Sequence, residues 1–329
     1  ASTIEQTQIE NLPINGRNYL EFILLTPGTT DANTLVNFSA PQTPASGISF
    51  GGQDLRSNNL TIDGADNMDA VSNGVRATLS QEAIQEFQVT RNSYAAEFGR
   101  ARGGVVNIVS KSGTNSFHGN AFFYFRNNSL DARNTFSKID DPPFSRYQFG
   151  GTLGGPVVKD KTFFFTSFER LDREESNFVT FLDNPSIFEP TRDDQQRYEN
   201  VSQMELFEFL GSTGIPQLQL LSAAFIHPQL GVLYTNENTF PDTVERFEAE
   251  SGIFPFQADQ TTFSFKLDHQ FTENNNFFAR VNYTDSFDEG AKFGALQGVS
   301  NGINFVIDDF SLVLSDTHIF SSTTLNDFR

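Results

Sequence analysis

Long segments in which apolar and polar residues alternate are the feature that most constrains the fold of this chain. In residues 261–271, Phe263, Phe265 and Leu267 fall on one face of an extended backbone, and polar side chains fall on the other. Similar alternation, less regular in some cases, recurs in residues 117–126, 147–153, 162–171, 276–284, 305–320 and 323–329. Because the side chains of a β-strand point to opposite faces in turn, the pattern predicts seven strands. Several are about ten residues long, which exceeds the usual five or six of soluble sheets.

The connections between the seven predicted strands alternate in length. Long connections at 127–146, 172–260 and 285–304 are separated by short ones at 154–161, 272–275 and 321–322. An up-and-down barrel in an outer membrane has this asymmetry, with short turns on the periplasmic side and long loops outside. A soluble β-sandwich with one solvated face is the alternative. The chain has no apolar run of ~20 residues for a membrane helix, but a spanning strand needs only ~9–11 residues.

Residues 1–116 follow a different pattern and predict a compact α+β domain. Helical spacing over 14–25 stops at the breaker pair Pro27-Gly28. Short strand-like runs occupy 47–52, 59–63, 86–90 and 105–110. Ser80 has the position of a helix N-cap, with Glu82 in the first turn. Four short strands and two small helices suit a domain of this size.

The charge balance and the residues available for chemistry exclude several functions. With 41 acidic and 22 basic residues the net charge is −19, which argues against a nucleic-acid partner. Cysteine is absent, so disulfides, thiolate metal sites and a cysteine nucleophile are excluded. No phosphate-binding loop, dinucleotide fingerprint, nucleophile elbow or zincin motif occurs, and no acidic pair stands out as a glycosidase dyad. The four histidines (His118, His227, His269 and His318) lie far apart, so we expect no metal site, no cofactor and no enzymatic activity.

Six segments, in order, resemble the plug domain of TonB-dependent outer-membrane receptors. They are 11–18 (NLPINGRN), 25–28 (LTPG), 48–52 (ISFGG), 60–64 (LTIDG), 82–89 (EAIQEFQV), and 97–99 with 103–113 (EFG and GGVVNIVSKSG). The first two resemble the Oar-like subgroup of the family. Residues 91–93 (RNS) depart from the Arg-Gly-Pro common at this place, which also favours the Oar-like subgroup over siderophore receptors.

The resemblance implies an α+β plug domain at 1–116, followed at 117–329 by the N-terminal part of an antiparallel transmembrane β-barrel. This barrel is incomplete, because an open seven-stranded edge cannot sit in lipid and Arg329 falls inside a strand pattern. We therefore expect a fragment. Its first residues lack the features of a signal peptide, so we expect the upstream part, with the TonB box, to be processed or missing. The insertion 172–260 is expected to be an extracellular cap with short helices at 201–210 and 218–225.

The function implied by the resemblance is energised uptake, or export, of a large solute through a plugged barrel in the outer membrane of a Gram-negative-type bacterium. The implied partners are TonB with its inner-membrane energising complex, acting on a tail upstream of this chain, outer-membrane lipid and an unknown large solute. Two alternatives stay open at this point: a surface structural or adhesive β-protein, and a soluble all-β carbohydrate-active protein. A lipid-facing apolar belt ~25 Å tall would favour the transporter.

The resemblance places ligand binding at the apical plug loops 53–58, 66–76 and 91–96. The candidate ligand-binding residues there are Gln53, Asp54, Arg56, Asn58, Asp66, Asn67, Asp69, Asn73, Arg76, Arg91, Asn92 and Tyr94. The plug arginines that could pair with carboxylates of a polar, hydrated barrel interface are Arg17, Arg91, Arg100 and Arg102, with ordinary surface charges as the alternative. Asp63, Asp66, Asn67 and Asp69 crowd together, but their spacing misses an EF-hand loop. We favour a turn with Asx-type hydrogen bonds over a calcium site there.

Overall fold

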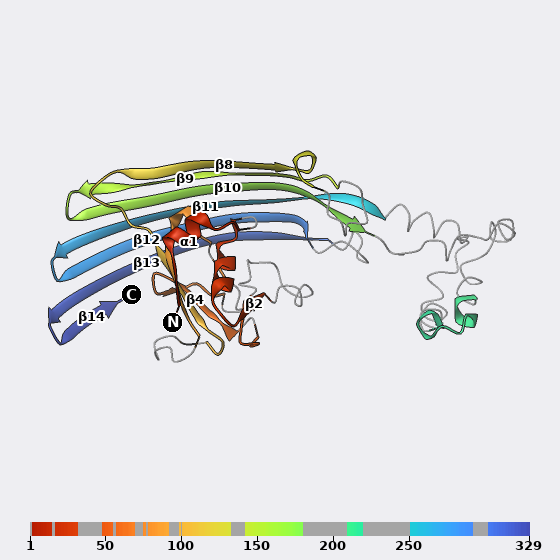
Figure 1. Cartoon of the computed structure of the whole chain (residues 1–329), viewed down its shortest axis with the longest axis horizontal. Coiled ribbons are helices and arrows are strands. Elements are labelled where there is room, and N and C mark those ends of the chain that lie inside the picture. The colour runs from red at the N-terminus through yellow and green to blue at the C-terminus, as the bar shows by residue number, and fades with distance from the viewer. Residues whose placement is uncertain are drawn as a thin grey trace.

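The structure, a computed structural model, describes residues 2–14, 17–31, 48–54, 57–69, 75–76, 78–91, 99, 101–132, 142–179, 209–219, 251–291 and 302–329. Its main elements are an arched seven-stranded sheet and a smaller body on the concave side of that sheet (Figure 1). We call the seven-stranded sheet the wall and the smaller body the plug. The plug comes first in the chain, and the wall follows from β8 onward.

The wall is an antiparallel meander in which each strand pairs with its neighbours in sequence. Its strands are β8 (His118–Asn127), β9 (Ser145–Val158), β10 (Thr162–Val179), β11 (Gly252–Thr272), β12 (Asn275–Ala291), β13 (Ile303–Ser321) and β14 (Thr324–Phe328). All seven predicted wall strands are confirmed, in the predicted order. The described wall strands form one sheet rather than two packed sheets, so the sandwich alternative is wrong.

The alternation in the sequence places apolar side chains outside the arch and polar side chains inside it. The outward face carries a cross-strand row of four exposed aromatic residues: Phe168, Phe263, Tyr283 and Phe310. The neighbouring inward row on the first three of these strands is polar and buried: Glu169, Thr262 and Thr284. A soluble sheet buries its apolar face instead. The wall therefore has an outer face suited to lipid and an inner face suited to a lumen. No described helix is long and apolar enough to cross a membrane.

The wall strands extend further than the sequence pattern indicated. β10 and β11 stay paired up to Val179 and Gly252, so the insertion between them begins at residue 180 rather than 172. The added part of β10 contains Arg173, Glu174 and Glu175, which break the apolar alternation and were therefore assigned to a loop. Charged side chains interrupt a lipid-facing pattern, but they do not interrupt the backbone hydrogen bonds of a hairpin that continues into water.

The plug is built on a five-stranded sheet in the order β1-β6-β7-β4-β5, in which β4 and β7 are parallel. Its strands are β1 (Ser2–Glu5), β4 (Asn59–Ile62), β5 (Ala65–Asp66), β6 (Ile84–Thr90) and β7 (Val105–Ser110), beside a ribbon of β2 (Thr29–Asp31) and β3 (Ile48–Phe50). Ile23, Ile84, Phe87 and Ile108 are fully buried at its centre. The plug thus has an apolar core of its own and does not depend on the wall for one.

Two predicted helical features of the plug are present in shorter form. The Ser80 hydroxyl accepts a hydrogen bond from the Glu82 N–H and begins the 3-10 helix Gln81–Ala83, which confirms the predicted cap. The helix expected over 14–25 is a 3-10 helix at Tyr19–Leu25, and it ends before the Pro27-Gly28 pair as expected.

Other helical segments were missed or lie largely outside the described residues. The sequence analysis missed β1 and the following helix α1 (Gln6–Asn11), because α1 buries only Ile9 and lacks an apolar stripe. In the insertion, the structure describes 209–219, of which 209–212 and 216–219 are helical. The rest of the helices expected at 201–210 and 218–225 lies outside the described residues.

Candidate functional site

The plug meets the wall through polar side chains, and the first contact is built by a tight turn between β4 and β5. Asp63 and Gly64 both have positive φ angles, +50° and +78°, as an Asp-Gly hairpin turn requires. The turn aims the Asp63 carboxylate at the end of β7. There the Ser110 N–H and hydroxyl donate hydrogen bonds of 2.8 and 2.6 Å to its two oxygens. The plug alone therefore orients this carboxylate.

Two cations of the wall complete this contact, which we call the Asp63 junction. Arg280 of β12 donates one hydrogen bond to Asp63 Oδ2 and another, of 3.1 Å, to the Ile62 carbonyl. Lys266 of β11 lies 3.8 Å from Asp63 Oδ2 and donates to Ser110 Oγ at 3.2 Å. Lys266 also lies 4.0 Å from Asp268. The side chains of Asp63, Arg280 and Lys266 are only 6%, 2% and 8% exposed, so these charges depend on one another for stabilisation.

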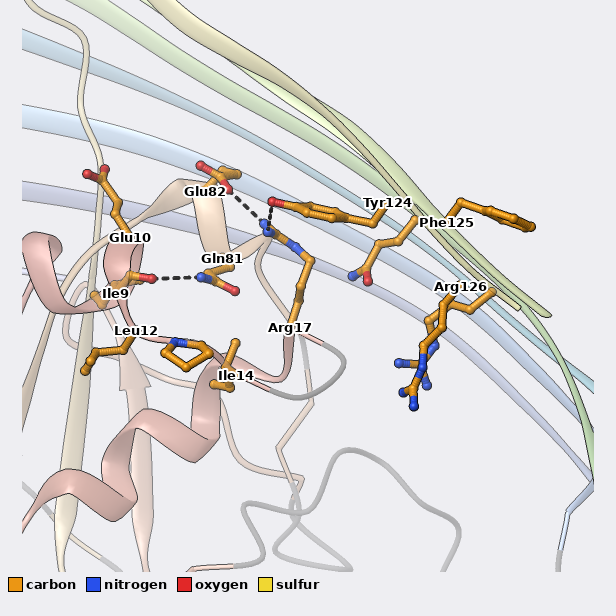
Figure 2. A pocket seen from close by; sticks show the side chains of 13 residues that line it. Ile9, Glu10, Leu12, Ile14, Arg17, Gln81, Glu82, Tyr124, Phe125 and Arg126 are labelled. Carbon is orange, nitrogen blue, oxygen red and sulfur yellow. Dashed lines mark hydrogen bonds and ion pairs between the residues drawn. The ribbon is translucent and has the colours of Figure 1, made fainter. Parts of the chain in front are cut away.

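A second contact, the Arg17 junction, has the opposite polarity. Arg17 has a φ of +57°, a left-handed conformation that costs free energy for a residue with a long side chain. Its guanidinium donates to Glu82 Oε1 of the plug at 2.9 Å and lies 3.7 Å from Glu169 Oε1 of β10. The same group stacks on two aromatic rings of β8, 4.3 Å from the Phe122 centroid and 5.1 Å from that of Tyr124. Figure 2 shows Arg17 reaching from the plug toward Glu82 and Tyr124.

Carboxylates link the Arg17 junction to three neighbouring wall strands. Glu82 accepts a hydrogen bond of 2.5 Å from Asn120 of β8. Glu169 accepts one of 2.6 Å from Gln148 of β9 and one of 2.5 Å from the Ser80 hydroxyl of the plug. Ser80 therefore caps a helix and contacts the wall at once. The junction is a network of charged and amide groups rather than an apolar contact.

A third contact joins the plug to β13 and is more exposed than the two junctions. Arg76 donates to Asp309 of β13 at 2.8 Å, and its side chain is 46% exposed. Nearby, Gln260 of β11 donates to the Thr78 hydroxyl at 3.3 Å. Arg76 was expected on a ligand-binding loop, and the structure places its guanidinium against the wall instead.

Two of the candidate ligand-binding residues, Asn58 and Asn67, are buried within the plug. Asn58 is 3% exposed and its amide donates to the Ile48 carbonyl at 2.5 Å. Asn67 is 6% exposed, and its backbone bonds to Leu60 and Arg76. Sequence position alone placed both in polar loops, but asparagine in a tight turn often satisfies backbone groups inside the fold.

The remaining candidates have varied surroundings. Gln53, Asp54 and Arg102 are exposed, and Asp69 is half-buried. Asp66 is exposed and accepts a hydrogen bond of 3.1 Å from the Met68 N–H, which is the favoured Asx turn. Arg91 packs over Gly28, whose φ of +78° and lack of a side chain leave room for the guanidinium. Arg56, Asn73, Asn92, Tyr94 and Arg100 lie outside the described residues.

Arg17 lines two cavities between the plug and the wall. The larger, about 570 Å³, lies between the segment from Ile9 to Arg17 and strands β8 and β9 (Figure 2). The smaller, about 310 Å³, lies between the plug and strands β9 to β13. Arg17 and Gln148 line both cavities. Within the described part of the chain no three acidic or histidine side chains gather as a metal site would need.

The wall residues of the junctions were missed by the sequence analysis. Glu169, Lys266 and Arg280 occupy polar positions of alternating strands, where serine, threonine and asparagine are equally suitable. The only available signal was a charged side chain on the face expected to line the lumen.

The arched sheet with its apolar outer face, polar inner face and enclosed plug defines a plugged β-barrel protein of the outer membrane, of which this chain contains the first strands. Residues 109–329 match the family model described as an outer membrane beta barrel domain, so the chain belongs to that family.

Two relatives of this chain are TonB-dependent proteins. The TonB-dependent transporter Oar of Myxococcus xanthus is 32% identical over 136 residues, which cover 37% of this chain and 12% of the relative. The probable TonB-dependent siderophore receptor PirA of Acinetobacter baumannii is 38% identical over 80 residues, 24% of this chain and 9% of the relative. The matched segments thus span a small part of either relative.

A solved structure supports the same fold. The outer membrane transporter YddB of Escherichia coli superposes with a TM-score of 0.57 and 12% identity, over 97% of this chain and 37% of that protein. The resemblance to TonB-dependent receptors, made from the plug segments, is confirmed. These relatives are receptors and transporters rather than enzymes.

Proposed function

We propose that this chain is the plug domain (1–116) and the first barrel strands (117–329) of a receptor that moves a large solute across the outer membrane, driven by TonB. The polar, ion-paired contact between plug and wall is the observation that carries the proposal. Polar groups at such a contact can exchange partners with water when the plug moves, whereas an apolar contact would expose a dry surface. The described apolar core of the plug consists of plug residues alone, so movement along the wall leaves the core intact.

The N-terminal segment is suited to receive the pulling force. β1 is an edge strand that pairs only with β6 among the described strands, and α1 follows it directly. Force applied upstream of Ser2 would detach β1 and α1 before reaching Arg17. TonB and its inner-membrane complex are the proposed source of that force, and uptake is its proposed result. We propose no enzymatic activity, cofactor or nucleic-acid partner.

The proposal is tested by labelling a buried residue that the force would expose. This chain has no cysteine, and Ile9 of α1 is 1% exposed, so Ile9→Cys adds a concealed thiol to it. Any cysteine elsewhere in the full-length protein is first replaced by serine. In cells in native growth medium, maleimide labelling of Ile9→Cys is expected only when TonB and the proton-motive force are present. Gln85→Cys, at an exposed position, controls for folding and reagent access. Equal labelling of Ile9→Cys with and without TonB contradicts the proposal.

A further inference from the structure

Three arginines form a cross-strand row on the lumen face of the wall, two residues beyond the row that contains Tyr124 and Gln148. Arg126 of β8 is directly opposite Arg146 of β9, and Arg146 is directly opposite Arg173 of β10. Arg173 shares the inward face of β10 with Glu169, since the two are four residues apart. Like charges in directly opposed positions destabilise strand pairing, so this arginine row requires compensating negative charge.

Three carboxylates of the described residues lie near the three arginines, but they leave some of the guanidinium N–H groups without a hydrogen bond. Asp131 forms an ion pair with Arg126. One oxygen of Glu175 is shared by two arginines, lying 3.5 Å from Arg146 Nη2 and 3.4 Å from Arg173 Nε. Asp288 faces the row from β12, opposite Ala258. The Nε atoms of Arg146 and Arg173 are buried and make no hydrogen bond to any described residue. The described protein groups therefore leave part of the hydrogen-bonding capacity of these two guanidiniums unused, and both side chains line a cavity.

The surroundings of the arginine row have room for a solute with apolar parts. Arg126 and Arg146 line the larger cavity, and Arg173 lines the smaller one. Both volumes fall in the range of small-molecule sites, which is ~300–1,000 Å³. The ring of Phe144 lies 5.2 Å from the Arg126 guanidinium and 5.6 Å from that of Arg146, within cation–π distance of both. On the plug side, the larger cavity has the apolar surface of Leu12, Pro13 and Ile14.

We propose that the arginine row binds an organic oxyanion, with carboxylate or phosphate groups on the guanidiniums and an apolar part against Leu12–Ile14. The guanidinium fork matches both kinds of oxyanion in planar, paired hydrogen bonds. The row lies on the lumen face directly beside the plug, so the anion would be held where it meets the plug. This inference rests on the proposed transport function and names the chemical class of its solute.

Binding to the purified full-length protein in detergent tests the inference, with calorimetry as the measurement. The probes are tricarballylate, inorganic phosphate and the neutral sugar maltotriose. One or both anions are expected to bind, and Arg146→Gln is expected to lower their affinity about tenfold or more, because it removes a charged hydrogen-bond donor. Glu175→Gln is expected to raise the affinity, because it removes the carboxylate that competes with the probe. Maltotriose is expected not to bind at the row.

The matched control is Arg170→Gln, on the same strand but on the outward face, where Arg170 bonds to Asp172 and Thr261. It is expected to bind the anions as the unmodified protein does. Binding of neither anion, an equal loss in Arg146→Gln and Arg170→Gln, or weaker binding in Glu175→Gln overturns the inference. Calorimetry needs no TonB, so a negative result here leaves the proposed function standing. If the Ile9→Cys labelling test fails but the anions bind, the proposed function is contradicted and the anion site is still supported.

Discussion

The Asp63 carboxylate is oriented before the wall contributes anything, because Ser110 on the neighbouring strand donates two hydrogen bonds to it. The wall nonetheless stabilises its buried negative charge, since Arg280 and Lys266 are buried with it. A buried ion pair loses most when only one partner is removed, because the other is left without a counter-charge.

We expect Asp63→Asn to weaken docking of the plug by about 3–5 kcal/mol, since it leaves Arg280 buried without its carboxylate. Asparagine adopts positive φ readily, so this variant keeps the turn and tests the charge. Urea denaturation of the full-length protein, followed by hydrogen exchange in β4 and β7, measures the change. Arg76→Gln at the exposed third contact is the control and should cost about 0–1 kcal/mol. Equal effects of the two variants would contradict the assigned importance of the buried junction.

Tyr19 predicts a dependence of plug stability on alkaline pH. Burial raises the pKa of its hydroxyl far above the usual value of about 10, although the nearby Leu79 backbone and the charge of Arg280 act against this. A group whose pKa is raised on folding stabilises the fold fully below its unfolded pKa, and this contribution is lost as pH rises above that value. The denaturation midpoint should therefore fall above about pH 10, and fall less in Tyr19→Phe. Parallel pH profiles for the two proteins would exclude this role.

At the scale of elements, each wall strand has an apolar outward face and a polar inward face. Apolar and polar residues therefore alternate along its sequence. Phe263 and Gln260 of β11 lie on opposite faces, the first exposed on the outer surface and the second lining the smaller cavity. We expect Phe263→Arg to destabilise the barrel by about 2–4 kcal/mol, because a charge there meets lipid. Gln260→Arg places the charge beside the smaller cavity and loses only the 3.3 Å hydrogen bond to Thr78, so it should cost much less. Folding titrations into lipid vesicles measure both, and similar costs would mean that the outer face does not contact lipid.

The same alternation explains which parts of the fold could be predicted from sequence. The strands from 117 onward were all found, because a lipid-facing side leaves a regular apolar signal that does not depend on other elements. The ends of β10 and β11 were not predicted, because a hairpin outside the bilayer needs only backbone hydrogen bonds and no apolar alternation. α1 was missed because its single buried residue, Ile9, makes no pattern. At the site, Arg17 was singled out as a plug arginine, but its partners Glu82 and Glu169 were not, because pairing across the lumen leaves no trace in local spacing.

At the scale of the whole molecule, the two buried junctions have opposite polarity. At one, a plug carboxylate meets wall cations; at the other, the cation Arg17 meets the wall carboxylate Glu169. Rotating the plug within the wall would bring like charges together, so the pair of junctions specifies one orientation.

A charge exchange tests this orientation effect. Arg17→Glu places a third carboxylate beside Glu82 and Glu169, and we expect the plug to dock less stably, seen as faster hydrogen exchange in the 3-10 helix Gln81–Ala83. Adding Glu169→Arg should restore part of the protection, because it again opposes unlike charges at the same place. If the second change gives no recovery, the junction acts through packing rather than charge.

The length of the β10–β11 hairpin has a consequence for how a solute first encounters the protein. The outward face of β10 becomes polar at Arg170, yet the strand runs on to Val179, about 30 Å further along its axis. β8 and β9 end much sooner on the same side, at Asn127 and Ser145. Among the described strands the rim is therefore uneven. Under the proposed function, a solute arriving from outside would meet the β10–β11 hairpin before it reaches the ends of β8 and β9.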